Sequence, residues 1–408
     1  MPIRQRQFEH FGSERGNGSD LYPRWVGARE LLLHHNNPYS AEVTEEIQRG
    51  FYGHVLGRAE YQRNDERIRD SLSDPEEFVY PVYVVFLLAP SLPFSFATVS
   101  RVFMGILLVL TPSSLWLWMR GLGLRLRGWE AGLGLITVMS SYPVVDGLHL
   151  QQITLLVAGL MAGALAALER GWLVVAGVLM ALTMVKPQLA ILVVIFLLLW
   201  TLGEWRARWR FAAGFGGMMA VLLGASEVVL PGWFGMWRKA LGSYAANHKP
   251  PLLLDMMGRG TAWMVAGLAM AAIAGVFWYV RKDAAAGRGF SFAVVAALAL
   301  TVMVLPNAGR AYYNEVLLVP GVLWMATVGR ELGEKNRLSD GMWWVAAGVL
   351  VAAWILALPP SVAVLAWHHR FEREATFLVT GPEFLMFFFP LFLGLFLASV
   401  GPWACRRV

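Results

Sequence analysis

Residues 150–202 read LQQITLLVAGLMAGALAALERGWLVVAGVLMALTMVKPQLAILVVIFLLLWTL, and they decide the fold class. Three apolar runs, at about 150–168, 171–185 and 187–202, follow one another with only short polar breaks. Each run approaches the length of about 20 residues that an α-helix needs to cross a lipid bilayer. The stretch therefore predicts consecutive membrane-spanning helices.

The rest of the 408-residue chain repeats this pattern. Charged residues make up only 15% of it, whereas a soluble globular chain carries about 25%. Further apolar runs lie at about 97–119, 129–143, 211–230, 261–280, 290–305, 311–329, 341–358 and 383–403. We therefore predict an all-α polytopic membrane protein with about eleven spans. One more run, 79–94, is interrupted by three prolines and is short enough for a re-entrant or interfacial helix.

Charge divides the chain at residue 78. Residues 1–78 hold half of the 28 acidic residues, and the remainder is strongly basic. We expect a polar N-terminal segment over 1–78, with short amphipathic helices, and a transmembrane bundle over 79–408. Because the basic residues belong to the membrane body, the sequence pI near 9.5 predicts no nucleic-acid partner. The single cysteine, Cys405, excludes a cysteine-rich metal site.

The basic residues of the membrane body predict its orientation. They fall between apolar runs in five clusters: Arg120, Arg125 and Arg127; Arg206, Arg208 and Arg210; Arg281, Lys282 and Arg288; Arg330, Lys335 and Arg337; Arg406 and Arg407. All five are cytoplasmic if every span from residue 97 onward crosses. Residues 1–78 are then extracytoplasmic if 79–94 is re-entrant and cytoplasmic if it spans; charge alone leaves both open.

The loops of the opposite face hold polar residues that are candidates for a site. Asp20 precedes a helical stripe, and it is either a helix N-cap or a carboxylate held as a general base. Lys186 interrupts an apolar stretch, and it either snorkels at a turn or points inward as a phosphate or carboxylate ligand. His149 and Gln152 lie at the entrance of a span, where amide donors suit an anion as well as a helix cap.

Two later stretches add positive charge to the same face. Arg310 stands beside Tyr313, which is typical of an interface belt but also of a bidentate phosphate site. His248 in the preceding loop can add charge, although a solvent-exposed or headgroup-facing position is the simpler interpretation. No metal-ligand spacing accompanies these residues.

Five stretches together resemble glycosyltransferase family 87, the polyprenol-phosphate-mannose-dependent group of the GT-C superfamily. They are, in chain order, DLYPRWVGARELLLHHNNPYS, FVYPVYVVFLLAPSLPF, YPVVDGLHLQQITLLVAGL, AGVLMALTMVKPQLA and LPNAGRAYYNEVLLVP, and they cover roughly residues 19–330. Two departures stand out: the family pattern has a span before its first aspartate, so the chain is expected to start late or to be truncated, and a usual Gly-Gln pair is Gln151-Gln152 here.

The resemblance implies a GT-C-like bundle in the plasma membrane with its active site on the extracytoplasmic face. It implies transfer of a mannose-like hexose from a polyprenyl-phosphate sugar to a hydroxyl of a lipid or glycan acceptor, with inversion and without cofactor or metal. Asp20 matches the family's catalytic aspartate and is expected to be the general base, which makes 79–94 re-entrant or interfacial. Lys186, Arg310 and His248 are expected to bind the donor phosphate, and five further residues to bind substrate: Arg24, Tyr39, His149, Gln152 and Tyr313.

A multi-pass transporter or lipid-carrier flippase is the alternative, because an intramembrane lysine and proline-broken helices also mark transport paths. Transporters usually show two corresponding halves, and the sequence shows none. A non-catalytic membrane subunit, with the polar clusters serving packing and caps, is a third possibility.

Overall fold

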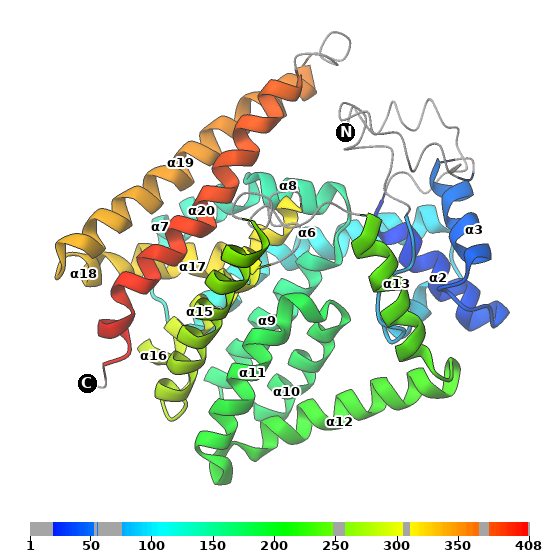
Figure 1. Cartoon of the computed structure of the whole chain (residues 1–408), viewed down its shortest axis with the longest axis horizontal. Coiled ribbons are helices and arrows are strands. Elements are labelled where there is room, and N and C mark those ends of the chain that lie inside the picture. Colours follow the sequence, from blue (N-terminus) through cyan, green and yellow to red (C-terminus); the bar gives the residue numbers. More distant parts are fainter. Residues whose placement is uncertain are drawn as a thin grey trace. The chain divides into compact units, whose positions relative to one another are not determined.

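The computed structural model describes residues 19–52, 55, 76–247, 258–304, 311–366 and 375–406. In these parts every regular element is a helix (Figure 1), which confirms the all-α prediction. The chain divides into two compact units. Unit 1 comprises residues 1–106, 149–152 and 220–249, and unit 2 comprises 107–148, 153–219 and 250–408. This packing division differs from the predicted boundary at residue 78, which concerns the membrane and stays a prediction.

Unit 1 is built on the helix α2 (Leu21–His34), which the sequence predicts from its apolar stripe. Ala28 and Leu31 are buried as that stripe requires. The helix ends at His34 because His35 adopts a left-handed backbone with φ 59°, which closes the last turn onto Glu30. Helix α3 (Ala41–Tyr52) packs on α2, burying Val43 and Ile47.

The proline-interrupted run 79–94 forms only the short helix α5 (Val84–Leu88) and the 3₁₀ turn η1 (Ala89–Ser91). Eight helical residues rise far less than the roughly 30 Å of a bilayer core. The run is therefore not a helical span, in agreement with the re-entrant or interfacial interpretation. Helix α13 (Trp233–Asn247) packs on this segment, with the indole N–H of Trp237 donating to the carbonyl of Val79 at 3.1 Å.

Two long helices run through both units, namely α6 (Phe96–Gly121) and α12 (Trp205–Val229). The other helices of unit 2 before residue 305 are α7 (Gly128–Met139), α8 (Tyr142–His149), α9 (Ile153–Glu169), α10 (Leu173–Leu182), α11 (Pro187–Gly203), α15 (Arg259–Val280) and α16 (Arg288–Val304). The remainder are η3 (Tyr312–Leu318), α17 (Val319–Trp324), η4 (Met325–Gly329), α18 (Arg330–Gly333), α19 (Arg337–Ala366) and α20 (Ala375–Ala404). The last two lie side by side in Figure 1 and pack on each other.

Fewer helices are long enough to cross a membrane than the apolar runs predict. Within the described residues three helices are long and apolar enough to cross a membrane, namely α6, α12 and residues 260–280 of α15. A fourth is possible if α7 and α8, which meet at a bend of 52°, form one broken span. The run 311–329, predicted as a single span, is divided into a 3₁₀ segment, a short α-helix and a π-helical turn. Eleven regular spans are therefore not confirmed.

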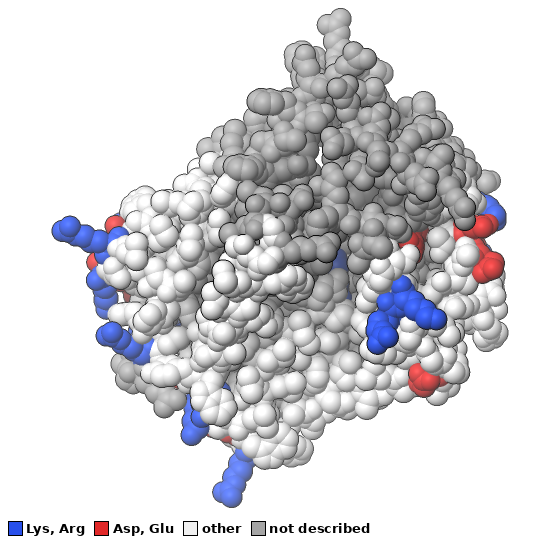
Figure 2. Space-filling view, viewed as in Figure 1, with Lys and Arg blue, Asp and Glu red and all other residues white. Residues whose placement is uncertain are grey.

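The surface of these helices suits lipid. On the face that Figure 2 shows, the charged residues of the described chain are few, and uncharged residues lie between them. Large apolar side chains of α15, such as Trp263, Leu268 and Trp278, are more than half exposed. Exposed apolar surface of this kind is unfavourable in water and neutral in a bilayer.

Glycines bring the helices of unit 2 into close contact. A Cβ on Gly177 of α10 would overlap the backbone carbonyl oxygen of Phe211 in α12, and one on Gly214 would overlap that of Val174. In the glycine-rich stretch 213–217, Gly214 thus serves close helix packing. Gly216 and Gly217, by contrast, have no atom within 4 Å of an added Cβ.

The basic clusters, apart from Arg407, which lies outside the described residues, gather at one end of unit 2. A Cβ on Gly123 would lie 2.5 Å from the carbonyl oxygen of Ala286, Arg288 donates to the carbonyl of Arg406 at 2.9 Å, and the Lys335 ammonium lies 4.6 Å from the centre of the Trp403 ring. The loops that carry the clusters therefore share one end, as the charge pattern predicts. Their assignment to the cytoplasm stays a prediction.

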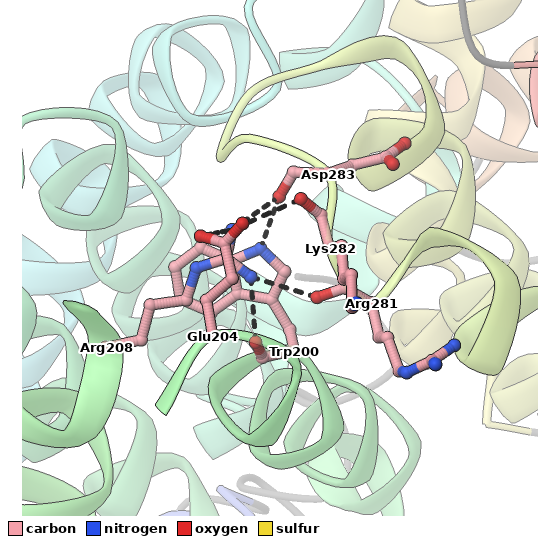
Figure 3. Close-up of polar contacts among 6 residues, drawn as sticks. All are labelled: Trp200, Glu204, Arg208, Arg281, Lys282 and Asp283. Atoms are coloured by element: carbon pink, nitrogen blue, oxygen red, sulfur yellow. Dashed lines mark hydrogen bonds and ion pairs between the residues drawn. The ribbon is translucent and has the colours of Figure 1, made fainter. Parts of the chain in front are cut away.

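Arg208 joins two of these loops (Figure 3). It is only 6% exposed, although its sequence neighbours Arg206 and Arg210 are exposed. Its guanidinium lies over the ring of Trp200 and donates to the carbonyls of Trp200 at 2.8 Å, Arg281 at 2.9 Å and Asp283 at 2.9 Å. Trp200 lies in the last turn of α11, whose carbonyls have no partner within the helix, and Arg281 and Asp283 follow the end of α15. Arg208 is thus a structural link and not only a topology signal.

Candidate functional site

Asp20 stands directly before α2, and its carboxylate does not cap that helix. The residue has helical backbone angles, φ −66° and ψ −9°, and makes no side-chain cap hydrogen bond. Ser19 takes the cap's place, because its Oγ accepts the N–H of Leu21 at 3.2 Å. Asp20 therefore occupies the N-cap position without capping the helix through its side chain, and its carboxylate binds elsewhere.

The turn 150–152 supplies a partner of this carboxylate. The Gln152 side-chain amide donates from Nε2 to Oδ2 of Asp20, and the backbone N–H of Asp20 donates to the carbonyl of Leu150 at 3.0 Å. Gln152 is 1% exposed, and its Oε1 has no hydrogen-bond partner among the residues that the structure describes. Asp20 is thus bound by two residues of this turn, through its main chain by Leu150 and through its side chain by Gln152.

Gln151 fixes the shape of this turn. Its backbone is left-handed, with φ 53°, a conformation that is uncommon for a residue other than glycine. Its Oε1 accepts the hydroxyls of Ser19 at 2.6 Å and Ser100 at 3.0 Å, and its Nε2 donates to the carbonyl of Ser100 at 2.8 Å. The strain of one residue is therefore compensated by bonds to α2's start and to α6.

Arg24 and Tyr39 meet at a third residue, Tyr80. The Arg24 guanidinium donates to the Tyr80 hydroxyl at 3.1 Å and lies 4.5 Å from the centre of its ring. The Tyr39 hydroxyl donates to the Tyr80 carbonyl at 2.6 Å. Burial raises the pKa of the Tyr39 phenol, so the phenol remains a hydrogen-bond donor across the ordinary pH range. We call Asp20, Arg24, Tyr39, Tyr80 and Gln152 the Asp20 cluster; all of it belongs to unit 1.

Lys186 lies within unit 2 between the 3₁₀ turn η2 (Thr183–Val185) and α11. It is 6% exposed, so it does not snorkel to the surface. Its Nζ donates to the Thr154 hydroxyl at 2.7 Å and lies 4.9 Å from the centre of the Tyr313 ring. The hydroxyl of Thr154 in turn donates to Oδ1 of Asn314 at 3.1 Å. We call Thr154, Lys186, Tyr313 and Asn314 the Lys186 cluster.

The Lys186 cluster lies at the end of unit 2 opposite to the basic loops. Lys186 precedes the first residue of α11, and Gly203, which packs on the carbonyl of Arg281, is the last. A helix of 17 residues is about 25 Å long, so α11 separates the two ends by most of a bilayer core. The inward alternative for Lys186 is the one that the structure supports.

The remaining predicted residues are only partly placed. His149 ends α8 and is half-buried in unit 1. Arg310 and His248 lie outside the described residues. Glu315, one residue beyond the Lys186 cluster, is 7% exposed, and its Oε1 has no hydrogen-bond partner among the residues that the structure describes. Within the same parts of the chain, no three His, Cys, Asp or Glu side chains come together as a metal site.

Four members of these networks escaped the sequence prediction. Tyr80, Ser100, Thr154 and Asn314 are residue types that occur everywhere in helical proteins, and nothing in their spacing distinguishes them. Asn314 carries the best signal, since it follows Arg310 and Tyr313 in one polar stretch. Which of these side chains meet is decided by the packing of elements far apart in sequence.

Comparison with known proteins identifies a family. The sequence model of glycosyltransferase family 87 matches residues 78–306, which is more than half of the chain. The matched range includes Gln152 and Lys186, and it begins after Asp20 and ends before Arg310. Searches of curated proteins and of solved structures found no match.

Proposed function

This chain belongs to glycosyltransferase family 87, and we propose that it transfers a mannose-like hexose from a polyprenyl-phosphate donor to a hydroxyl of a lipid or glycan acceptor. The membership and the apolar helices together describe a membrane glycosyltransferase. The donor, the sugar, the inverting course and the residue roles are our proposal. One observation carries it: the Asp20 carboxylate does not serve as a helix cap and is held instead by the Gln152 amide.

Asp20 is proposed as the general base. The acceptor oxygen attacks the anomeric carbon and passes its proton to the Asp20 carboxylate. The bond from that carbon to the phosphate oxygen breaks, and its electron pair leaves on the polyprenyl phosphate. Attack opposite to the leaving group inverts the anomeric centre. Because phosphate leaves without being protonated, a single carboxylate suffices.

The Lys186 cluster is proposed to hold the donor phosphate. An ammonium in a buried site stabilises charge that develops on the leaving phosphate, an effect that can amount to several kcal/mol. Arg310 and His248 are proposed to add to it. Gln152 and Thr154, which contact Asp20 and Lys186 respectively, are only two residues apart in the sequence.

The other residues of the Asp20 cluster are proposed to bind substrate. Arg24, Tyr39 and His149 bear donors suited to sugar hydroxyls, and Tyr313 offers an aromatic face next to Lys186. Gln152 is assigned chiefly to Asp20, because its amide nitrogen is used there. The site is proposed to open to the extracytoplasmic side of the plasma membrane, since the Lys186 cluster lies opposite to the basic loops.

A donor comparison tests this function. The full-length protein, purified in a neutral detergent, is incubated with a radiolabelled hexose carried either on a polyprenyl phosphate or on a nucleoside diphosphate, together with acceptor lipids or oligosaccharides. We expect transfer only from the polyprenyl phosphate, and a product of opposite anomeric configuration. Transfer from the nucleotide sugar alone, or retention of configuration, would contradict the proposal.

A further inference from the structure

A hydrogen-bond chain of fixed direction joins Lys186 to Asn314. The Lys186 ammonium has protons only to donate, so the oxygen of Thr154 is the acceptor in the bond of 2.7 Å. The single hydroxyl proton of Thr154 then goes to Oδ1 of Asn314 at 3.1 Å. This order fixes which end of the Asn314 amide faces Thr154. The amide nitrogen must therefore present its two N–H groups elsewhere.

Those two N–H groups have no acceptor among the residues that the structure describes. Within these residues, the bond that Oδ1 accepts from Thr154 is the one hydrogen bond of the Asn314 side chain. Asn314 is 7% exposed, Lys186 6% and Thr154 fully buried. The amide nitrogen itself is not fully buried, so a ligand can reach it, and one that supplies an acceptor gains a hydrogen bond there. The ligand must accept hydrogen bonds.

The surroundings favour an acceptor that is negatively charged. Lys186 supplies a positive charge within the same hydrogen-bond chain, and the first turn of α11, which begins at Pro187, supplies the positive end of a helix dipole. Hydrogen bonds from an ammonium and an amide to a phosphate oxygen are charge-assisted and stronger than those to a neutral oxygen. A phosphate group fits these donors better than a sugar hydroxyl does.

We propose that the amide nitrogen of Asn314 and the ammonium of Lys186 together bind the phosphate of a prenyl phosphate, with Thr154 holding both side chains in register. The prenyl part of this assignment rests on the proposed function; the phosphate part rests on the donors. Asn314 is thus a donor-binding residue in addition to those predicted from the sequence. It contacts the ligand directly, whereas Thr154 is a positioning residue.

Binding without transfer is the direct test. The full-length protein in neutral detergent is titrated with geranylgeranyl phosphate, geranylgeraniol and inorganic phosphate, and binding is followed by tryptophan fluorescence. Asn314→Asp replaces the amide donors by a carboxylate of the same size, and we expect it to weaken binding of the prenyl phosphate at least about tenfold. Asn336→Asp is the matched control, because the exposed Asn336 uses only its Oδ1, which an aspartate retains, at the basic end of unit 2.

Each outcome bears on the proposal. Prenyl phosphate affinities of Asn314→Asp and Asn336→Asp within twofold of each other would overturn it. Inorganic phosphate displacing the prenyl phosphate at equal concentration would overturn the lipid as the source of the phosphate. If Asn314→Asp does not fold, hydrogen exchange of the wild-type protein replaces it: peptides covering 183–187 and 312–318 should be protected by the prenyl phosphate and not by the alcohol, and equal protection by both would refute the site.

This test is separate from that of the transferase activity. A protein that binds prenyl phosphate through Asn314 but transfers no sugar would retain the site and lose the proposed reaction. If Asn314→Asp transferred sugar and bound prenyl phosphate as well as the wild-type protein, the proposed reaction would be retained and the Asn314 site would be refuted.

Discussion

Replacing Arg208 by methionine should destabilise the protein strongly, and replacing Arg206 in the same way should not. Methionine retains the apolar stem of arginine and removes the guanidinium. At position 208 this deletes three bonds of 2.8–2.9 Å to carbonyls of the last turn of α11 and of the loop after α15 (Figure 3). Arg206 lies two positions before Arg208 and is exposed. Arg206→Met therefore controls for the loss of one positive charge.

The expected magnitude follows from which carbonyls lose their donor. The carbonyl of Asp283 retains the indole N–H of Trp200 at 2.8 Å, so only those of Trp200 and Arg281 lose a strong bond. Each bond to a charged donor contributes about 1.5–3 kcal/mol, and the recovered solvation of the arginine offsets part of this. The pair with the half-exposed Glu204 adds at most about 0.5 kcal/mol. We expect Arg208→Met to lower the free energy of unfolding by about 3 kcal/mol and Arg206→Met by less than about 0.5 kcal/mol.

Unfolding of the purified variants in mixed micelles of dodecyl maltoside and increasing sodium dodecyl sulfate, followed by circular dichroism, measures this difference. Arg208→Lys should fall between the two, because lysine keeps the charge but not the planar group that reaches three carbonyls. Equal unfolding midpoints for Arg208→Met and Arg206→Met would refute the structural role of Arg208 and return it to the surface cluster that the sequence predicts.

Two further predictions concern α10–α12 packing and the base. Gly177→Ala should destabilise the protein by about 1–3 kcal/mol, because the added Cβ overlaps backbone atoms of α12. Gly216→Ala, whose added Cβ has no atom within 4 Å, should stabilise it by about 0.5–1 kcal/mol. The same micelle titration measures both, and a more stable Gly177→Ala than Gly216→Ala would contradict the contact between α10 and α12. Gln152→Met removes the side-chain donor that holds the Asp20 carboxylate, so the rate of sugar transfer should fall about tenfold, while Gln48→Met, at another buried glutamine of unit 1, should leave the rate unchanged. Equal rates in the two variants would show that Gln152 does not position Asp20.

Hydropathy and charge predicted the helices but not their division. The runs around 97–119, 211–230 and 261–280 became α6, α12 and α15, because long apolar sequence with few polar groups has no alternative to a helix in lipid. The run 311–329 is not one helix. Hydropathy could not predict this division, because it does not register the backbone changes near Pro320. The positive-inside pattern grouped Arg208 with its neighbours, because this pattern counts only charges and contains no information on the carbonyls that Arg208 binds.

The candidate site divides in the same way. Asp20 and Lys186 could be selected from the sequence, because a carboxylate or an ammonium next to a membrane is costly and demands an explanation. Their partners could not: the Gln152 amide reaches Asp20 across 132 positions, and Asn314 reaches Thr154 across 160. Such pairs depend on tertiary packing and leave no mark in local spacing.

The rate of sugar transfer by Asp20→Asn tests the central claim most directly. Asparagine has the shape of aspartate, so the variant should fold and insert into the membrane, but its amide cannot accept the proton of the acceptor hydroxyl. We expect kcat with a polyprenyl-phosphate sugar to fall about 10²- to 10⁴-fold, the usual contribution of a general base, while binding of geranylgeranyl phosphate stays unchanged. Wild-type turnover in Asp20→Asn would contradict the assignment of the base.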